Sequence, residues 1–404
     1  MDPNAGRPAR QYQWSVGFQR EITKDMVAEA SYVANRGVWW QAPVLLNLNA
    51  ISPQALAARG LSLNNSADLT LLTSLLSSTT AQQRGFSNPP YPGFPLGQTV
   101  AQSLRPFPQF TTIPVYWDPL GKSWYDSLQM KVTKRLSRGL FFLSTFTWSK
   151  SLVLGTETGE PNPGSAGGAL VNDVFNRNQN KYISAYDRPY DFNTSITYTT
   201  PKLRGNKVVS WILSDWTYGA NLQYSSAPPL QVPLAQSNLN SYVLYGSTSP
   251  PTAISFANRV PGVPLYTVDL NCHCYDPNKT FVLNPAAWVD PAAGQYGASP
   301  AYYNDYRAQR RPRENMNFGR TFRMGEDGRY TFSIRMEFSN VFNRAFWGDP
   351  TGTALTNAKL QQTYLPNGNT SAGFGRVLTT APSAFGSVFN LYPRQGVLVG
   401  RFTF

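Results

Sequence analysis

The chain has 404 residues, of which 14% are charged and 14% are aromatic. An average soluble domain carries about 25% charged residues, so this chain is poor in charge, and its aromatic content argues against disorder. Its 32 Pro and 31 Gly residues leave little room for long helices, and no stretch has the roughly 18 consecutive apolar residues that a membrane-spanning helix needs. The composition favours an all-β fold and excludes a helical membrane protein.

The net charge is +13, from 35 Lys and Arg residues against 22 Asp and Glu residues. A basic chain of this kind is compatible with nucleic acid, an anionic membrane surface or acidic glycans as partners. The basic residues are spread along the sequence, and no nucleic-acid recognition motif accompanies them. We therefore expect no nucleic-acid partner.

The two cysteines flank the only histidine, in the order Cys272, His273, Cys274. Structural zinc sites usually separate paired cysteines by two to four residues and take a second pair of ligands, which this chain lacks. A local disulfide or two free thiols is the expected state of the cysteines. No metal and no cofactor are predicted.

Segments of about ten residues alternate apolar and polar side chains. Tyr12, Trp14 and Val16, for example, are separated by small or polar residues. A period of two is that of a β-strand, and ten residues is the length of a tilted strand that crosses a membrane. Nine strands are predicted, at residues 11–19, 26–35, 123–135, 140–149, 192–199, 215–224, 313–324, 330–339 and 395–404.

The connections between these strands alternate in length. Short connections are expected at 20–25, 136–139 and 325–328, a medium one at 201–213, and long ones at 36–122, 151–190, 225–312 and 341–394. Bacterial outer-membrane barrels have short periplasmic turns, long extracellular loops, aromatic girdles and a polar lumen. A soluble β-sandwich also alternates, but its strands average nearer five or six residues. We predict an antiparallel transmembrane β-barrel of the outer-membrane type; the first long loop also predicts a short helix within 54–77.

The number of strands suggests a partial barrel. If the short turns are periplasmic, the first strand descends from the outside, whereas single-chain bacterial barrels usually have an even number of strands. No secretory signal follows Met1. We expect residues 1–404 to be the C-terminal portion of one barrel domain, without the N-terminal domain, plug and earlier strands of the whole protein.

A series of motifs, in order along nearly the whole chain, resembles the C-terminal half of an Oar-like TonB-dependent receptor, a family with a carboxypeptidase-regulatory-like N-terminal domain. The motifs are Tyr12–Glu21, Glu29–Gly37, Tyr125–Arg135, Phe146–Ser151, Asp187–Arg188, Asp191–Asn193, Asn284–Ala287, Phe338–Asn343, Phe374–Arg376 and Gly400–Phe404. The resemblance implies a 22-stranded barrel with a plug that imports or binds ligands such as siderophores, oligosaccharides or peptides. It implies contact with the TonB energising complex only through an N-terminal part that this chain does not contain.

Two groups of residues are candidates for function. The last strand resembles the signal that the barrel-assembly machinery reads, with Leu398, Phe402 and Phe404 on one face, where an aromatic end suits the lipid interface. The polar positions of two other strands are expected to face the lumen. These lumen candidates are Gln129, Lys131, Thr133, Arg335 and Glu337.

Catalysis has weak support in the sequence. Carboxylates such as Glu157, Glu160, Asp173 and Asp187 offer pairs of the kind that glycosidases use, but no nucleophile or nucleotide-binding motif accompanies them. We expect a non-enzymatic outer-membrane receptor or transporter segment that contacts outer-membrane lipid and an unknown extracellular ligand. The alternatives are a surface adhesion or structural protein without energised uptake, and a secreted soluble carbohydrate-binding β-protein.

Overall fold

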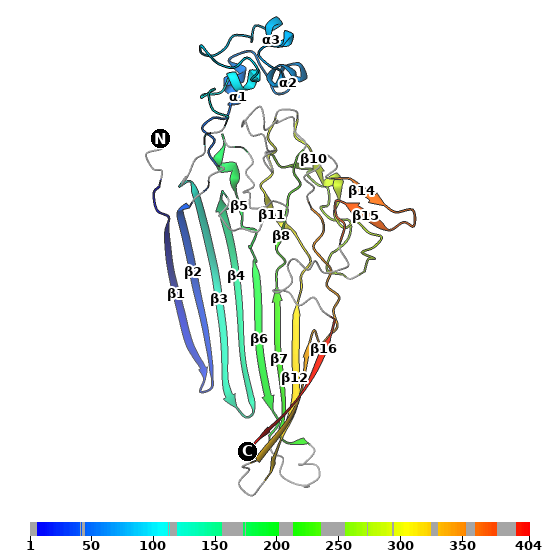
Figure 1. Ribbon diagram of the computed structural model, residues 1–404. Helices are drawn as coiled ribbons and strands as arrows, with labels where there is room; N and C mark the ends of the chain where they lie inside the picture. The colour runs from blue at the N-terminus through cyan, green and yellow to red at the C-terminus, as the bar shows by residue number, and fades with distance from the viewer. Residues whose placement is uncertain are drawn as a thin grey trace.

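The computed structural model describes residues 6–40, 42, 45–111, 113, 119–155, 173, 175–201, 213–235, 255–272, 274–292, 295–324, 330–352, 360–377 and 393–404. Its main feature is one large antiparallel sheet in the order β1-β2-β3-β4-β6-β7-β12-β13-β16, with the short β5 paired to β4 (Figure 1). Among the described residues, β1 and β16 are the two edges of this sheet. The strands are β1 (Arg10–Thr23), β2 (Met26–Trp40), β3 (Gly121–Ser137), β4 (Leu140–Leu154), β5 (Lys181–Ile183), β6 (Tyr190–Thr199), β7 (Trp216–Ser225), β12 (Arg313–Met324), β13 (Tyr330–Ser339) and β16 (Gln395–Thr403).

The nine long strands lie where the alternation predicts them, and several are longer. β2 continues to Trp40 and β4 to Leu154, beyond the predicted ends at residues 35 and 149. Residues that the alternation assigns to the long loops therefore continue these strands at the upper end of the sheet.

Two of the short connections are tight turns. Ser137 pairs with Leu140, and the two residues between them, Arg138 and Gly139, have φ angles of 51° and 80°. Positive φ at both central residues is the geometry of the two-residue hairpin turns whose twist matches that of the flanking strands. Asp25, in the turn from β1 to β2, accepts hydrogen bonds from Lys134, Ser137 and Thr23. These bonds, that of Lys134 above all, hold the pKa of the Asp25 carboxyl well below its usual range and join the two turns.

The pairing register separates the two kinds of side chain onto opposite faces of the sheet. Residues that pair directly across antiparallel strands lie on the same face. One row runs through Phe18, Ala30, Met130, Phe146, Phe192 and Tyr224, and a neighbouring row through Glu29, Lys131, Thr145, Asn193, Gln223 and Arg313. We call these the apolar face and the polar face. The apolar face is largely uncovered, since Phe18 is 80% exposed and Trp148 is 55% exposed.

The described parts of the long loops form a layer at the upper end of the sheet (Figure 1). Their short elements are α1 (Pro53–Ala57), α2 (Ser66–Thr73), α3 (Thr79–Gln83), α4 (Val100–Ser103), the 3-10 turns η1 (Arg177–Asn180) and η2 (Pro285–Ala287), β8 (Pro229–Gln231), β9 (Asn258–Arg259), β10 (Trp288–Val289), β11 (Tyr302–Arg307), β14 (Gln362–Tyr364) and β15 (Thr370–Gly373). One hydrophobic core joins β5 to the loop between β7 and β12, around Tyr306, Phe256 and Leu283. A second core holds the four helices together, around Leu71, Leu72 and Leu56.

The helix predicted within 54–77 forms as two separate helices. α1 and α2 are divided by a turn in which Gly60 has a φ of 69°, a conformation that suits glycine. Ser52 and Asn65 cap the two helices by accepting hydrogen bonds from the backbone N–H groups of Ala55 and Ala67. No helix among the described residues is long and apolar enough to cross a membrane.

A lysine at residue 146 tests the assignment of the two faces. Phe146 lies on the apolar face of β4 and its neighbour Thr145 on the polar face. If lipid covers the apolar face, Phe146→Lys places a charge between the bilayer midplane, where it costs about 2–4 kcal/mol, and the interface, where it costs about 0–1 kcal/mol, and it lowers the yield of heat-modifiable protein in outer membranes. Thr145→Lys is the matched control, and we expect a yield close to that of the wild type. Equal yields of the two variants would contradict the assignment.

Candidate functional site

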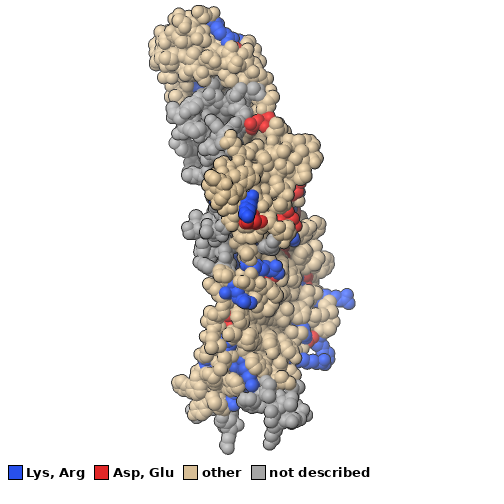
Figure 2. Space-filling view, turned by 90° about the vertical axis from the view of Figure 1, so that its right-hand side faces the viewer, with Lys and Arg blue, Asp and Glu red and all other residues tan. Residues whose placement is uncertain are grey.

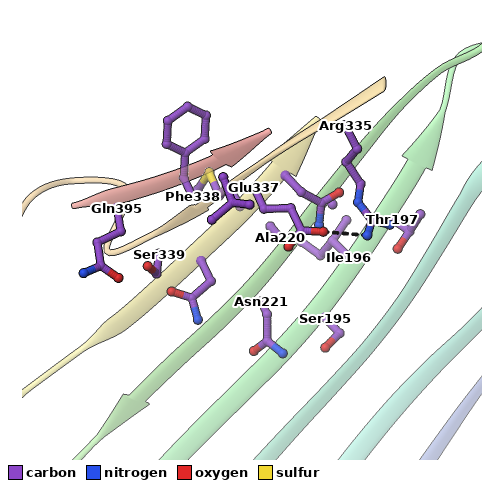
Figure 3. A pocket seen from close by; sticks show the side chains of 15 residues that line it. Ser195, Ile196, Thr197, Ala220, Asn221, Arg335, Glu337, Phe338, Ser339 and Gln395 are labelled. Carbon is purple, nitrogen blue, oxygen red and sulfur yellow. Dashed lines mark ion pairs between the residues drawn. The ribbon is translucent and has the colours of Figure 1, made fainter. Parts of the chain in front are cut away.

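The polar face is concave where the last strands curve over β6 and β7. A shallow pocket of about 470 Å³ lies there, between β6, β7, β12, β13 and β16. Its polar lining consists of amide, hydroxyl and charged groups: Ser195, Thr197, Asn221, Asn315, Asn317, Arg335, Glu337, Ser339 and Gln395. Figure 3 shows the Arg335 and Glu337 side chains directed over the strands that carry Thr197 and Asn221.

One ion pair spans part of this pocket. Arg335 Nη2 lies 2.5 Å from the Glu337 carboxylate, and the two side chains are 55% and 44% exposed. An exposed pair of this kind is worth only about 0–1 kcal/mol of stability. Its side chains therefore remain available for contacts with a solute or with another polypeptide segment.

The five predicted lumen residues all lie on the polar face, but in two places. Arg335 and Glu337 line the pocket, whereas Gln129, Lys131 and Thr133 lie several strands away on β3. Lys131 Nζ is 3.2 Å from Glu29, and Gln129 donates to the Ser127 hydroxyl over 3.2 Å. Thr133 carries a buried hydroxyl that lacks a hydrogen-bond partner among the described residues.

Alternation in the sequence does not single out the amide side chains of the pocket as site residues. Asn221 and Asn315 face each other across β7 and β12, and Asn317 lies close to Gly219, where a side chain would collide with its amide. All three occupy polar positions of their strands. The alternation predicts that they lie on the polar face, but only the pairing of the strands shows that they lie close together.

The last strand places its candidate assembly residues on the apolar face. Leu398 pairs with Met336, and Phe402 pairs with Phe332. The ring of Phe402 stacks on Phe404 and on Tyr330, each at 6.4 Å between centroids. Leu398, Phe402 and Phe404 are 68%, 55% and 87% exposed, so their side chains are accessible.

The loop layer is tied to the sheet by a buried ion pair at the upper end of β4. Arg307 of β11 lies 2.6 Å from the Asp187 carboxylate, and these side chains are only 14% and 1% exposed. Asp187 also accepts a hydrogen bond of 2.7 Å from the backbone N–H of Ser151 in β4. Arg307 donates in addition to the carbonyl oxygens of Asp187 and Ala227.

A second, smaller pocket lies beside this tether. It has a volume of about 330 Å³ and is lined by residues that include Tyr266, Asp269, Asp305 and Arg310. The Tyr266 hydroxyl donates to the Arg307 carbonyl oxygen over 2.7 Å, and burial raises the pKa of Tyr266 to about 12. The phenol is therefore neutral at physiological pH and holds β11 in place.

The cysteines form the local disulfide that was one of the two expected states. His273 lies outside the described residues. No group of three or more potential metal ligands occurs among the residues that the structure describes.

Of the candidate catalytic carboxylates, Asp187 is engaged by Arg307 and Ser151. Asp173 caps the backbone N–H of Phe175. Glu157 and Glu160 lie outside the described residues. The described contacts thus give Asp187 and Asp173 structural roles.

The outermost part of the loop layer is almost free of charge. Residues 48–111, which contain α1 to α4, include only four charged residues: Arg59, Asp68, Arg84 and Arg105. Asp68 pairs with Arg84 over 2.7 Å, and burial lowers the pKa of Arg105 to about 10. In Figure 2 the uppermost module is accordingly mostly tan, whereas Lys and Arg side chains are scattered over the molecule below it.

Loss of the buried tether should loosen the loop layer. Arg307→Ala leaves the Asp187 carboxylate buried without its cation, which costs about 3–5 kcal/mol, so proteases added to intact cells should cut the loops faster. Arg259→Ala is the matched control, because Arg259 pairs with Asp305 at the surface, with side chains 32% and 56% exposed, and such pairs contribute about 0–1 kcal/mol. Equal protease sensitivity of the two variants would show that the tether does not hold the layer.

Comparisons with known proteins place the chain in a family. The model of the outer membrane beta barrel domain family matches residues 1–395, and no curated protein matches the sequence. Among solved structures, the outer membrane transporter YddB from Escherichia coli is similar at 12% identity and a TM-score of 0.35, over 91% of this chain and 32% of that one. The deltaS2 mutant of the TodX monoaromatic hydrocarbon channel is similar at 10% identity and a TM-score of 0.18, over 82% of this chain and 54% of that one.

The chain thus spans about a third of the transporter's length. The family match covers nearly all of the sequence, and the antiparallel sheet of nine long strands agrees with it. The secreted soluble alternative is thereby set aside. The chain belongs to the outer membrane beta barrel domain family and lies in the outer membrane.

Proposed function

We propose that this chain is part of the wall of a TonB-dependent, Oar-like receptor that binds and takes up an extracellular ligand when joined to an N-terminal part. The ligand would be a siderophore, an oligosaccharide or a peptide. The observation that carries the proposal is a polar, concave face that continues from the short turns up to an ordered loop layer. Coupling to the TonB energising complex would pass through the N-terminal part.

The chemistry of the polar face suits passage of a polar solute. Its pocket offers amide groups, which both donate and accept hydrogen bonds, and a single ion pair. Such groups can replace hydrogen bonds to water by hydrogen bonds to a solute with only a small net change in free energy. Binding and passage, rather than catalysis, are therefore the proposed activity.

Surface adhesion is the second candidate. The helical module of residues 48–111 has its own hydrophobic core and projects farthest from the sheet (Figure 1). Tyr91, Phe107 and Phe110 are 37%, 44% and 52% exposed on it. Exposed rings supply flat apolar surface for contact with glycans or peptides, and such contact requires no transport.

An uptake assay separates the two candidates. Wild-type and deletion strains would receive a defined mixture of siderophores, oligosaccharides and peptides, with and without a protonophore, and loss of each compound from the medium would be measured. The proposal predicts depletion of at least one compound by the wild type only, and only without the protonophore. If the protonophore does not change the depletion of the compound, or if the compound binds to the cell surface without uptake, the adhesin is favoured.

A bulky residue in the polar pocket should slow uptake. Asn221→Trp fills the pocket from β7, and Leu222→Trp, one residue further along the strand and on the opposite face, is the matched control. We expect both variants to assemble, and the uptake rate of Asn221→Trp alone to fall by about an order of magnitude, or roughly 1.4 kcal/mol. A wild-type uptake rate for Asn221→Trp would show that the ligand does not pass through the pocket.

We also propose that the last strand is read by the barrel-assembly machinery through Leu398, Phe402 and Phe404. The exposed terminal ring is the group most accessible to such recognition. Deletion of Phe404 should reduce the amount of heat-modifiable barrel in the outer membrane severalfold, while Phe404→Tyr, which keeps the ring, should not. Unchanged barrel yield after the deletion would contradict the role of the terminal residue.

A further inference from the structure

The apolar face changes character in regular steps toward its upper end. The row of Phe18, Ala30, Met130, Phe146 and Phe192 is wholly apolar. The next row up contains Tyr32, Trp148 and Tyr190, which are 41%, 55% and 54% exposed. Tyr and Trp at one level of an outward face mark the boundary between hydrocarbon and headgroups.

Above these aromatic residues, cations appear on the same face among aromatic and aliphatic side chains such as Trp14, Trp124 and Leu152. Lys150 lies opposite Asp126 in the first row above them, and Arg36 lies between Tyr12 and Trp124 in the second. The third row joins Arg10, Val38, Lys122, Leu154 and Lys181 across β1 to β5. We call Arg10, Arg36, Lys122, Lys150 and Lys181 the cationic belt.

The belt has a large excess of positive charge. Asp126 is the only acidic residue in its three rows, which leaves five cations against one carboxylate. Asp126 is already satisfied, because Arg36 donates two hydrogen bonds of 2.9 Å to it and the Tyr32 hydroxyl donates one of 2.6 Å. Among the described residues, Lys122, Lys150, Lys181 and Arg10 form no ion pair.

Aromatic rings hold three of the cations against the surface. The Lys181 ammonium lies 4.4 Å from the Trp124 ring centroid, and the guanidinium groups of Arg10 and Arg36 lie 4.9 Å and 5.3 Å from the rings of Trp39 and Trp14. Such contacts orient a cation without neutralising it. At about 4.8 Å between strands, the belt is about 19 Å wide from β1 to β5, which is wide enough to meet several anionic groups.

We propose that the cationic belt binds the phosphate groups of a phosphorylated glycolipid in the outer leaflet of the outer membrane. Three observations select this partner: the excess positive charge, its height just above the aromatic row, and its place on the face that meets lipid. Lipid phosphates lie at this depth, and Lys and Arg residues near a charged membrane surface attract them. The proposal is independent of ligand uptake, since it concerns the opposite face of the sheet.

The experiment compares two triple variants of the full-length protein purified from outer membranes in mild detergent. Lys122→Gln, Lys150→Gln and Lys181→Gln remove belt charges, whereas Arg20→Gln, Lys24→Gln and Arg135→Gln remove as many charges at the opposite end of the sheet. Binding is titrated with lipid A carrying two phosphates and with its dephosphorylated form, and heat-modifiability confirms that each variant is folded. We expect the belt variant to bind phosphorylated lipid A about tenfold more weakly than the wild type, and the control variant to bind it normally.

Four results would overturn the proposal. One is unchanged binding by a folded belt variant, and another is an equal loss in both variants, which would indicate a general effect of net charge. The third is displacement of the lipid by inorganic phosphate at a similar concentration, which would indicate a site for free anions. The fourth is equal affinity of the wild type for the two forms of lipid A, which would show that the phosphates do not contribute to binding.

Discussion

The constraint on which this structure depends is the alternation of side chains along each strand, kept in register across nine strands. Because successive residues of a strand point to opposite faces, a strand that separates two different solvents needs a period of two. A slip of one residue in any pair would move polar groups onto the apolar face. Between β2 and β13 the register shifts only near strand ends, between Val38 and Trp40 and between Lys134 and Ser137. Parity is therefore kept along the central part of the strands.

The loops follow a different constraint. Segments this long have to bury apolar residues of their own, and they do so in separate cores for the helical module and for the layer around β11. The buried Asp187–Arg307 pair then fixes that layer to β4, since a buried carboxylate without its partner would be costly. A packed loop layer above a polar face is an arrangement that either ligand capture or adhesion could use.

The sequence predicted the strands well because alternation is a local signal that tertiary contacts rarely override over ten residues. It also placed Arg335 and Glu337 on the same face as Lys131, since parity is local too. It did not predict the pocket or the cationic belt, because these depend on which residues meet across strands, such as Asn221 with Asn315 or Lys122 with Leu154. Arg307 and Asp187 are 120 residues apart, and no local pattern marks such a contact.

The most direct test of the account is a scan of single cysteines along β4, from residue 141 to 149, in the protein reconstituted in lipid vesicles. Each cysteine would carry a fluorescent probe, and quenching by a lipid-bound agent and by a water-soluble agent would be compared. The account predicts strict alternation, with lipid quenching at residues 142, 144, 146 and 148 and aqueous quenching at the residues between them. Quenching by the water-soluble agent at every position would contradict a wall between lipid and a polar interior.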